Sequence, residues 1–111
     1  MKSIQQWCEE THELAKEKGW WDEPRNFPEV IALMHSELSE ALEEYRTAPS
    51  PYPLYYEDGN GKPCGIFMEL ADVVIRIMDY FGRTGYSLEK TIKIKHKYNK
   101  TRPYRHGDKQ A

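Results

Sequence analysis

The segment that most constrains the fold is residues 66–81, because its helical periodicity leaves very little polar surface. Apolar side chains cover well over half of its circumference: Leu70, Ala71, Val74, Ile75, Ile77 and Met78. The polar residues form one narrow strip: Glu69, Asp72, Arg76 and Asp79. A helix of this kind belongs in the middle of a helical bundle. We therefore predict an all-α fold, a four-helix-type bundle that is completed by oligomerisation.

Three further helices are predicted from capping signals and apolar periodicity, over residues 3–18, 26–46 and 87–100. The caps are Ser3 with Gln6, Asn26 with Glu29, and Ser87. Gly19, Gly82, Gly85 and Pro103 are expected to end helices. Seven side chains of the second helix are expected to face the core: Val30, Ile31, Met34, Leu38, Ala41, Leu42 and Tyr45.

Residues 47–64 are rich in proline, glycine and tyrosine, and they include Pro49 and Pro51. Loops of this length in a compact domain tend to be lids, binding loops or disordered segments. The pairs Asp58-Gly59 and Asn60-Gly61 suit tight turns, so a short hairpin is possible there. The loop is expected either to close over a substrate or to serve in assembly.

Composition places the chain among globular proteins, with 39% hydrophobic and 31% charged residues. We expect a single domain over residues 1–111, with an extended tail from about residue 103. No apolar run reaches the roughly 20 residues of a membrane span, and no signal-peptide pattern is visible, so no membrane partner is expected. Cys8 and Cys64 form neither a disulfide framework nor a zinc motif, and a cytoplasmic location fits best.

Charge is distributed unevenly although the net value is only -2. Residues 1–46 hold 11 acids and 5 bases, a net of -6, whereas residues 87–111 hold 2 acids and 8 bases, a net of +6. An acidic half could hold a metal ion and a basic segment could hold phosphate. Alternatively, the two surfaces attract each other within a dimer.

Two pairs of carboxylates are spaced three residues apart, Glu37 with Glu40 and Glu69 with Asp72. Residues at this spacing share one face of a helix. No base lies one turn away from Glu37 or Glu40 to relieve their charge, so this face favours a cation. If the two faces meet, their oxygens would suit Mg²⁺. The alternative for the later pair is simple exposure, with Asp72 and Arg76 forming an ion pair along the helix.

Two other features have both a structural and a functional interpretation. Trp20 and Trp21 are adjacent in a turn, so they either plug the end of the bundle or stack on a planar ligand. The lysines of residues 87–100 are either solvated or available to bind phosphate.

The acidic pairs resemble the ExxE and ExxD motifs of the MazG-like all-α nucleotide pyrophosphohydrolases. Glu37-Leu-Ser-Glu40 and Glu69-Leu-Ala-Asp72 are separated by 28 residues, each within a predicted helix. Lys95, Asn99 and Arg102 match a KxxxNxxR pattern that follows in this family. His12, nine residues before Trp21, together with residues 24–26, is similar to the first-helix region of the deoxycytidine triphosphatase branch.

This resemblance implies hydrolysis of a (deoxy)nucleoside triphosphate between its α and β phosphates, giving a monophosphate and pyrophosphate. It implies four ligands for Mg²⁺, or for Mn²⁺ as a substitute: Glu37, Glu40, Glu69 and Asp72. Glu40, with Glu37, is assigned the catalytic role, and Glu40 would position or deprotonate the attacking water. Six residues would bind substrate: His12, Trp20, Trp21, Lys95, Asn99 and Arg102. A homodimer or homotetramer is implied.

One position departs from the family pattern. Some relatives have a tyrosine one turn after the ExxD acid, where this chain has Arg76, so the identity of the base stays open.

Two alternative functions compete with this one. One is a non-catalytic helical protein that binds nucleic acid or an acidic partner through its basic segment, and the unrelieved acids around Glu37 disfavour it. The other is a di-iron bundle, which requires ExxH on two helices, whereas only Glu9-Glu10-Thr11-His12 fits.

Overall fold

A computed structural model describes residues 1–47 and 52–105. It contains four helices and one small hairpin in these ranges, listed here in chain order: α1 (Ile4–Glu17), α2 (Phe27–Thr47), β1 (Tyr56–Glu57), β2 (Pro63–Cys64), α3 (Ile66–Thr84) and α4 (Leu88–Thr101). The predicted all-α class is confirmed. Of the segments that the sequence singled out, Pro49 and Pro51 and the end of the tail from His106 onward lie outside the described residues.

Side-chain caps start three helices where the sequence predicted them. The Ser3 hydroxyl accepts from the Gln6 backbone N–H at 3.1 Å, and the Gln6 side chain accepts from the Ser3 N–H at 2.7 Å. The Asn26 side chain accepts from the Glu29 N–H at 3.0 Å, and Ser87 caps α4 through the Lys90 N–H. These caps satisfy first-turn amides that have no partner inside the helix.

Helix α3 extends three residues beyond the predicted end at Phe81, because Gly82 does not break it. A Cβ on Gly82 would lie 2.6 Å from the Cys8 carbonyl oxygen and 2.6 Å from the Cβ of His12. The glycine therefore allows α1 to cross α3 at close range, and its role is packing. The helix ends at Gly85, which has a left-handed conformation and donates its N–H to the Phe81 carbonyl.

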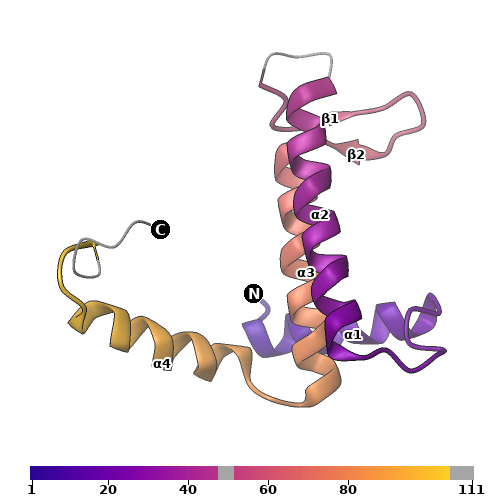
Figure 1. Ribbon diagram of the computed structural model, residues 1–111. Helices are drawn as coiled ribbons and strands as arrows, with labels where there is room; N and C mark the ends of the chain where they lie inside the picture. The colour runs from indigo at the N-terminus through magenta and orange to yellow at the C-terminus, as the bar shows by residue number, and fades with distance from the viewer. Residues whose placement is uncertain (48–51, 106–111) are drawn as a thin grey trace.

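Helices α2 and α3 run antiparallel as a long pair, α1 crosses one end of it, and α4 projects away (Figure 1). Both α1 and α2 pack extensively on α3, whereas α4 makes its few contacts with α1. A single chain thus does not close a four-helix bundle within the described residues.

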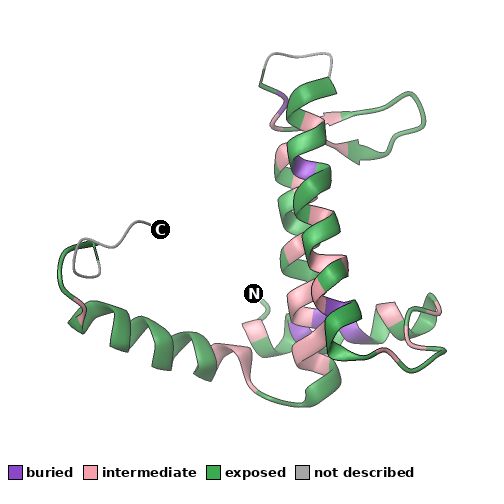
Figure 2. Cartoon of the chain, viewed as in Figure 1, coloured by how far each residue is buried: buried purple, intermediate pink, exposed green. Residues whose placement is uncertain are grey.

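The buried core of one chain is small (Figure 2). Among hydrophobic residues only Cys8, Val30 and Ala41 are buried within the described ranges. Of the seven side chains expected to face inward from α2, Leu38, Leu42 and Tyr45 are exposed instead, since no element covers them. Several large apolar side chains of α3 are exposed as well: Phe67, Leu70, Val74 and Ile75.

The hairpin predicted within residues 47–64 is present. Tyr56 pairs with Cys64, and the Asp58 carboxylate accepts from the Asn60 and Lys62 backbone N–H groups at 2.7 and 3.0 Å. The Tyr56 hydroxyl donates to the Glu44 carboxylate and so ties β1 to α2.

The chain before the hairpin caps α3 with backbone groups. The carbonyls of Pro53 and Leu54 accept from the N–H groups of Ile66 and Phe67 at 2.8 and 3.0 Å. Gly65 has a φ of 113°, and a Cβ there would lie 2.5 Å from the Leu54 oxygen. These contacts fix the start of α3 one turn before Glu69.

No helix in the described ranges combines the length and the apolar character that a membrane crossing needs.

Candidate functional site

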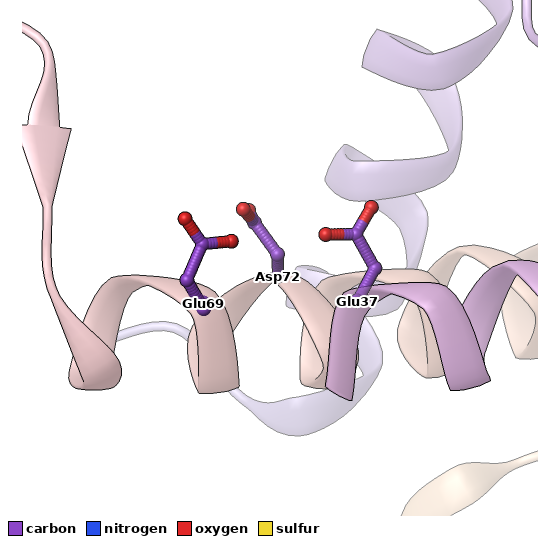
Figure 3. Close-up of side chains that lie close together, drawn as sticks. All are labelled: Glu37, Glu69 and Asp72. Carbon is purple, nitrogen blue, oxygen red and sulfur yellow. The ribbon is translucent and has the colours of Figure 1, made fainter. Parts of the chain in front are cut away.

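Three carboxylates from two helices converge on one point. Glu37 comes from α2, and Glu69 and Asp72 come from successive turns of α3; all three point to the same side of the helix pair (Figure 3). One oxygen from each lies within 4.8 Å of the others. The antiparallel packing of α2 on α3 brings these acids together although they are about 30 residues apart in the chain.

Burial and neighbouring acids disfavour the charged forms of Glu69 and Asp72. Burial, followed by the charges of Asp72, Glu37 and Glu40, raises the pKa of Glu69 above its ordinary value. Burial and then Glu37 raise the pKa of Asp72, while Arg76 and Lys62 act in the opposite direction. A divalent cation would relieve this repulsion.

The donor set fits Mg²⁺. All three groups are hard oxygen ligands, which Mg²⁺ prefers. The three oxygens lie within 4.8 Å of one another, so a shared ion would require the side chains to draw closer together.

Glu40, the fourth predicted ligand, is not part of the group of three. It is exposed on α2, one turn beyond Glu37. It is still close enough for its charge to raise the pKa of Glu69. The structure thus brings together three of the four predicted carboxylates and leaves Glu40 at the edge of the cluster.

Arg76 is an ionic partner of the cluster. Its Nε and Nη2 donate to the Oε1 of Glu37 at 3.1 and 3.0 Å. Its guanidinium also lies over the Trp20 ring, with the carbon 4.3 Å from the ring centroid. The hydrogen-bonded ion pair of Arg76 is therefore with Glu37 across the helices, and not with Asp72 along α3.

A cavity of about 470 Å³ adjoins the carboxylates. The α1 face contributes Trp7, Thr11, Leu14, Ala15 and Lys18, and the opposite side contributes Trp20, Glu37, Asp72, Ile75, Arg76 and Asp79. This volume lies in the range of small-molecule sites, and the mixture of aromatic walls with a few charged groups is typical of them. Glu37 and Asp72 belong to both the cavity and the cluster.

The two adjacent tryptophans have different surroundings. The Trp20 ring lines the cavity beside Arg76. The Trp21 indole N–H instead donates to the two carboxylate oxygens of Asp79 at 2.9 and 3.2 Å. The stacking interpretation therefore fits Trp20, and the plug interpretation fits Trp21.

His12 belongs to the same network as Trp21. Its Nδ1 lies 2.8 Å from Asp79 Oδ1, and both residues are buried. Neither His12 nor Trp21 lines the large cavity. Of the three aromatic residues predicted for a base pocket, Trp20 alone lines this cavity.

The predicted phosphate-binding residues lie apart from the carboxylates in one chain. Lys95 and Asn99 are on α4, and Arg102 follows it. Lys95 and Arg102 lie over the Tyr98 ring, 5.1 and 5.7 Å from its centroid. Because α4 projects away from the α2–α3 pair, these side chains do not join the cluster within a single chain (Figure 1).

Three residues of the site were not predicted from the sequence in these roles. Trp7, on α1, is half exposed and lines the cavity. Arg76 and Asp79 belong to the predicted polar strip, in which the partner considered for Arg76 is Asp72 and none is considered for Asp79. Their observed partners lie on other helices and in the turn after α1, so spacing along the chain contains no signal for them.

Comparisons with known protein families, with curated proteins and with solved structures found no match.

Proposed function

We propose that the protein is a Mg²⁺-dependent nucleotide pyrophosphohydrolase of the MazG-like type. It would cleave a (deoxy)nucleoside triphosphate to a monophosphate and pyrophosphate. The observation that carries this proposal is the convergence of Glu37, Glu69 and Asp72 at the edge of a cavity of about 470 Å³. Both motifs that resemble the family contribute to this one cluster, the first through Glu37 and the second through Glu69 and Asp72.

The three clustered acids would hold the metal, because each offers an oxygen to the same point. When bound, Mg²⁺, or Mn²⁺ in its place, supplies charge neutralisation for phosphate and a lowered pKa for water. Glu40 stands one turn from Glu37, exposed and outside the cluster. It is suited to orient the attacking water or to accept its proton.

The cavity would bind the nucleoside. Trp20 and Trp7 offer aromatic surfaces for a base, and Ile75 and Leu14 add apolar contact. His12, Trp21 and Asp79 would act indirectly, since their hydrogen bonds hold the turn that carries Trp20.

Assembly as a homodimer or homotetramer is part of the proposal. The exposed apolar side chains of α2 and α3 favour burial against a second copy. In one chain α4 does not pack extensively on α2 or α3, so a role in phosphate binding for Lys95, Asn99 and Arg102 requires the site of another subunit. The free thiols of Cys8 and Cys64 are compatible with a cytoplasmic location.

The decisive experiment is a panel of canonical and modified nucleoside triphosphates incubated with Mg²⁺ and assayed for pyrophosphate. Pyrophosphate, and not orthophosphate, is expected from at least one substrate. Glu37→Gln and Asp72→Asn should reduce it about 1,000-fold with the helical circular dichroism unchanged. Glu43→Gln is the matched control, because Glu43 is an exposed acid of α2 outside the cluster. No turnover on any substrate, or full turnover in both site variants, would contradict the proposal.

A second candidate is a non-catalytic protein that binds nucleic acid or an acidic partner through α4. It is favoured by one observation: residues 90–101 are all exposed and carry five lysines. This candidate predicts binding to nucleic acid that weakens steeply with salt and is lost when Lys93, Lys95 and Lys97 are replaced by Gln. Salt-insensitive or absent binding would exclude it.

A further inference from the structure

Arg76 contacts the acidic cluster and the wall of the cavity with one side chain. Its N–H groups hold Glu37 Oε1 at 3.0 and 3.1 Å, and its guanidinium carbon lies 4.3 Å from the centroid of Trp20. We propose that Arg76 is a positioning residue that couples cation binding at Glu37 to the binding of a phosphate group in the cavity. This inference rests on the proposed function.

A bound cation and Arg76 compete for Glu37. Without a cation, the guanidinium is the positive partner of a cluster that holds three carboxylates. Both the Glu37 and Arg76 side chains are mostly shielded from water, with 16% and 21% of their surface exposed, so their pairing is stronger than that of a surface ion pair. A divalent cation at the cluster attracts the same Oε1 atom and repels the guanidinium. Cation binding therefore weakens the contact between Arg76 and Glu37.

The guanidinium released from Glu37 can reach the interior of the cavity. Arg76 and Trp20 both line the cavity, so the side chain needs no backbone movement to reach its interior. Stacking on the indole keeps the planar group oriented. A guanidinium presents paired donors that match the oxygens of a phosphate. Arg76 would thus meet a phosphate only once the cation is in place.

The chain contains a matched control on the same helix. Arg83 also lies over a tryptophan, with its guanidinium carbon 4.9 Å from the centroid of Trp21. No hydrogen bond joins Arg83 to the carboxylates in the described residues, and it does not line the large cavity. Replacing Arg83 removes the same charge and the same type of stacking contact without touching the proposed coupling.

The test measures Mg²⁺ binding by calorimetry and by tryptophan fluorescence in the full chain. In Arg76→Gln, Mg²⁺ should bind about tenfold more tightly, since a nearby positive competitor is gone. Mg²⁺ should change the fluorescence of the native protein and of Arg83→Gln, but not that of Trp20→Phe or Arg76→Gln. Arg76→Lys keeps the charge without the planar fork, so it should bind Mg²⁺ within about threefold of the native protein and lose most of the fluorescence change.

A second titration uses a non-hydrolysable α,β-methylene nucleoside triphosphate in saturating Mg²⁺. Binding should weaken about tenfold in Arg76→Gln, so that one substitution has opposite effects on the metal and on the nucleotide. Weaker Mg²⁺ binding in Arg76→Gln would mean that Arg76 merely supports Glu37, and would overturn the coupling. Heats of Mg²⁺ binding with no fluorescence change that depends on Trp20 would also overturn the coupling, while leaving the metal site intact. Absence of Mg²⁺ heats in every variant would reject the metal site itself, and the coupling with it.

Discussion

Asp72 and Asp79 lie two turns apart on α3, yet their surroundings are opposite in character. Asp79 is buried and fully partnered, by His12 at 2.8 Å and by the Trp21 indole at 2.9 Å. Asp72 is more exposed, accepts no side-chain hydrogen bond from the described residues, and has two other carboxylates beside it. The surroundings of Asp79 are typical of a group that stabilises the fold. Those of Asp72 are typical of a group that could bind a cation.

The comparison explains why an acidic residue on a packed helix can serve either stability or function. Burial near donors satisfies the lone pairs of a carboxylate and fixes the elements that supply the donors. Partial loss of solvent near other acids raises the pKa of a carboxylate and costs stability, as it does at half-buried Glu69 and at the more exposed Asp72. Four predictions test this contrast.

The largest effect is expected for Asp72→Asn, which keeps the shape of the side chain and removes a charge from the cluster. Activity should fall about 1,000-fold, because the proposed metal loses a ligand. The melting temperature without Mg²⁺ should be unchanged or higher, since repulsion is relieved. Pyrophosphate release and thermal unfolding measure the two quantities. A large loss of stability would place Asp72 in the same structural class as Asp79.

Asp79→Ala should lower stability and leave Mg²⁺ binding in place, which is the reverse of the result expected for Asp72→Asn. It leaves His12 and the Trp21 indole without their shared acceptor in a buried place, which should lower the free energy of unfolding by about 2–4 kcal/mol. Urea denaturation gives this value, and Mg²⁺ binding by the folded fraction should persist. The control is Asp22→Ala in the exposed turn, for which little change is expected. Equal stability of both variants would remove the structural role of Asp79.

Gly82→Ala tests the close crossing that brings His12 to Asp79. The new Cβ meets the Cys8 carbonyl and the Cβ of His12, so α1 must shift, and we expect a loss of about 1–3 kcal/mol despite the better helix propensity of alanine. Gly59→Ala is the control, because nothing lies within 4 Å of its Cβ position. Chemical denaturation of both variants checks the difference. A stabilised Gly82→Ala would show that the crossing tolerates a side chain.

The smallest effect concerns pH. A raised carboxyl pKa means that the carboxyl group keeps its proton to a higher pH in the folded protein than in the unfolded chain. The contribution of Glu69 and Asp72 to stability therefore falls as pH rises through their raised pKa values. Melting temperatures measured between about pH 4 and pH 8 should fall less in Asp72→Asn than in the native protein. The increase in melting temperature caused by Mg²⁺ should grow with pH, because protons compete with the ion for the same oxygens. A pH-independent effect of Mg²⁺ would argue against binding at these acids.

The parts of the fold that sequence reasoning predicted well depend on local contacts. Ser3, Asn26 and Ser87 cap helices through groups three residues away, so the signal is contained in a short window. The hairpin around Asp58 has the same origin. Gly82 was misjudged because its effect depends on α1, a helix about 70 residues earlier in the chain.

The candidate site was predictable to the extent that helical spacing determines it. Spacing placed Glu69 and Asp72 on one face, and the ExxE motif supplied Glu37. Only the packing of α2 on α3 determines that Glu40 lies outside the group of three. The partner of Glu37 is Arg76, 39 residues away, which no rule of helical spacing could supply. The different roles of Trp20 and Trp21 depend on the position of Asp79 for the same reason.

The way α3 begins has a consequence for engineering and for divergence of the chain. The close approach of Leu54 to Gly65 and the backbone hydrogen bond from Phe67 to Leu54 hold the two ends of the hairpin together. Nothing lies within 4 Å of the Cβ positions of Gly59 and Gly61 at its tip. Residues added at the tip therefore leave the register of α3, and with it Glu69 and Asp72, where they are. A peptide tag or fluorophore attached there would report on assembly without disturbing the acids, whereas the same insertion next to Gly65 would rotate them out of place.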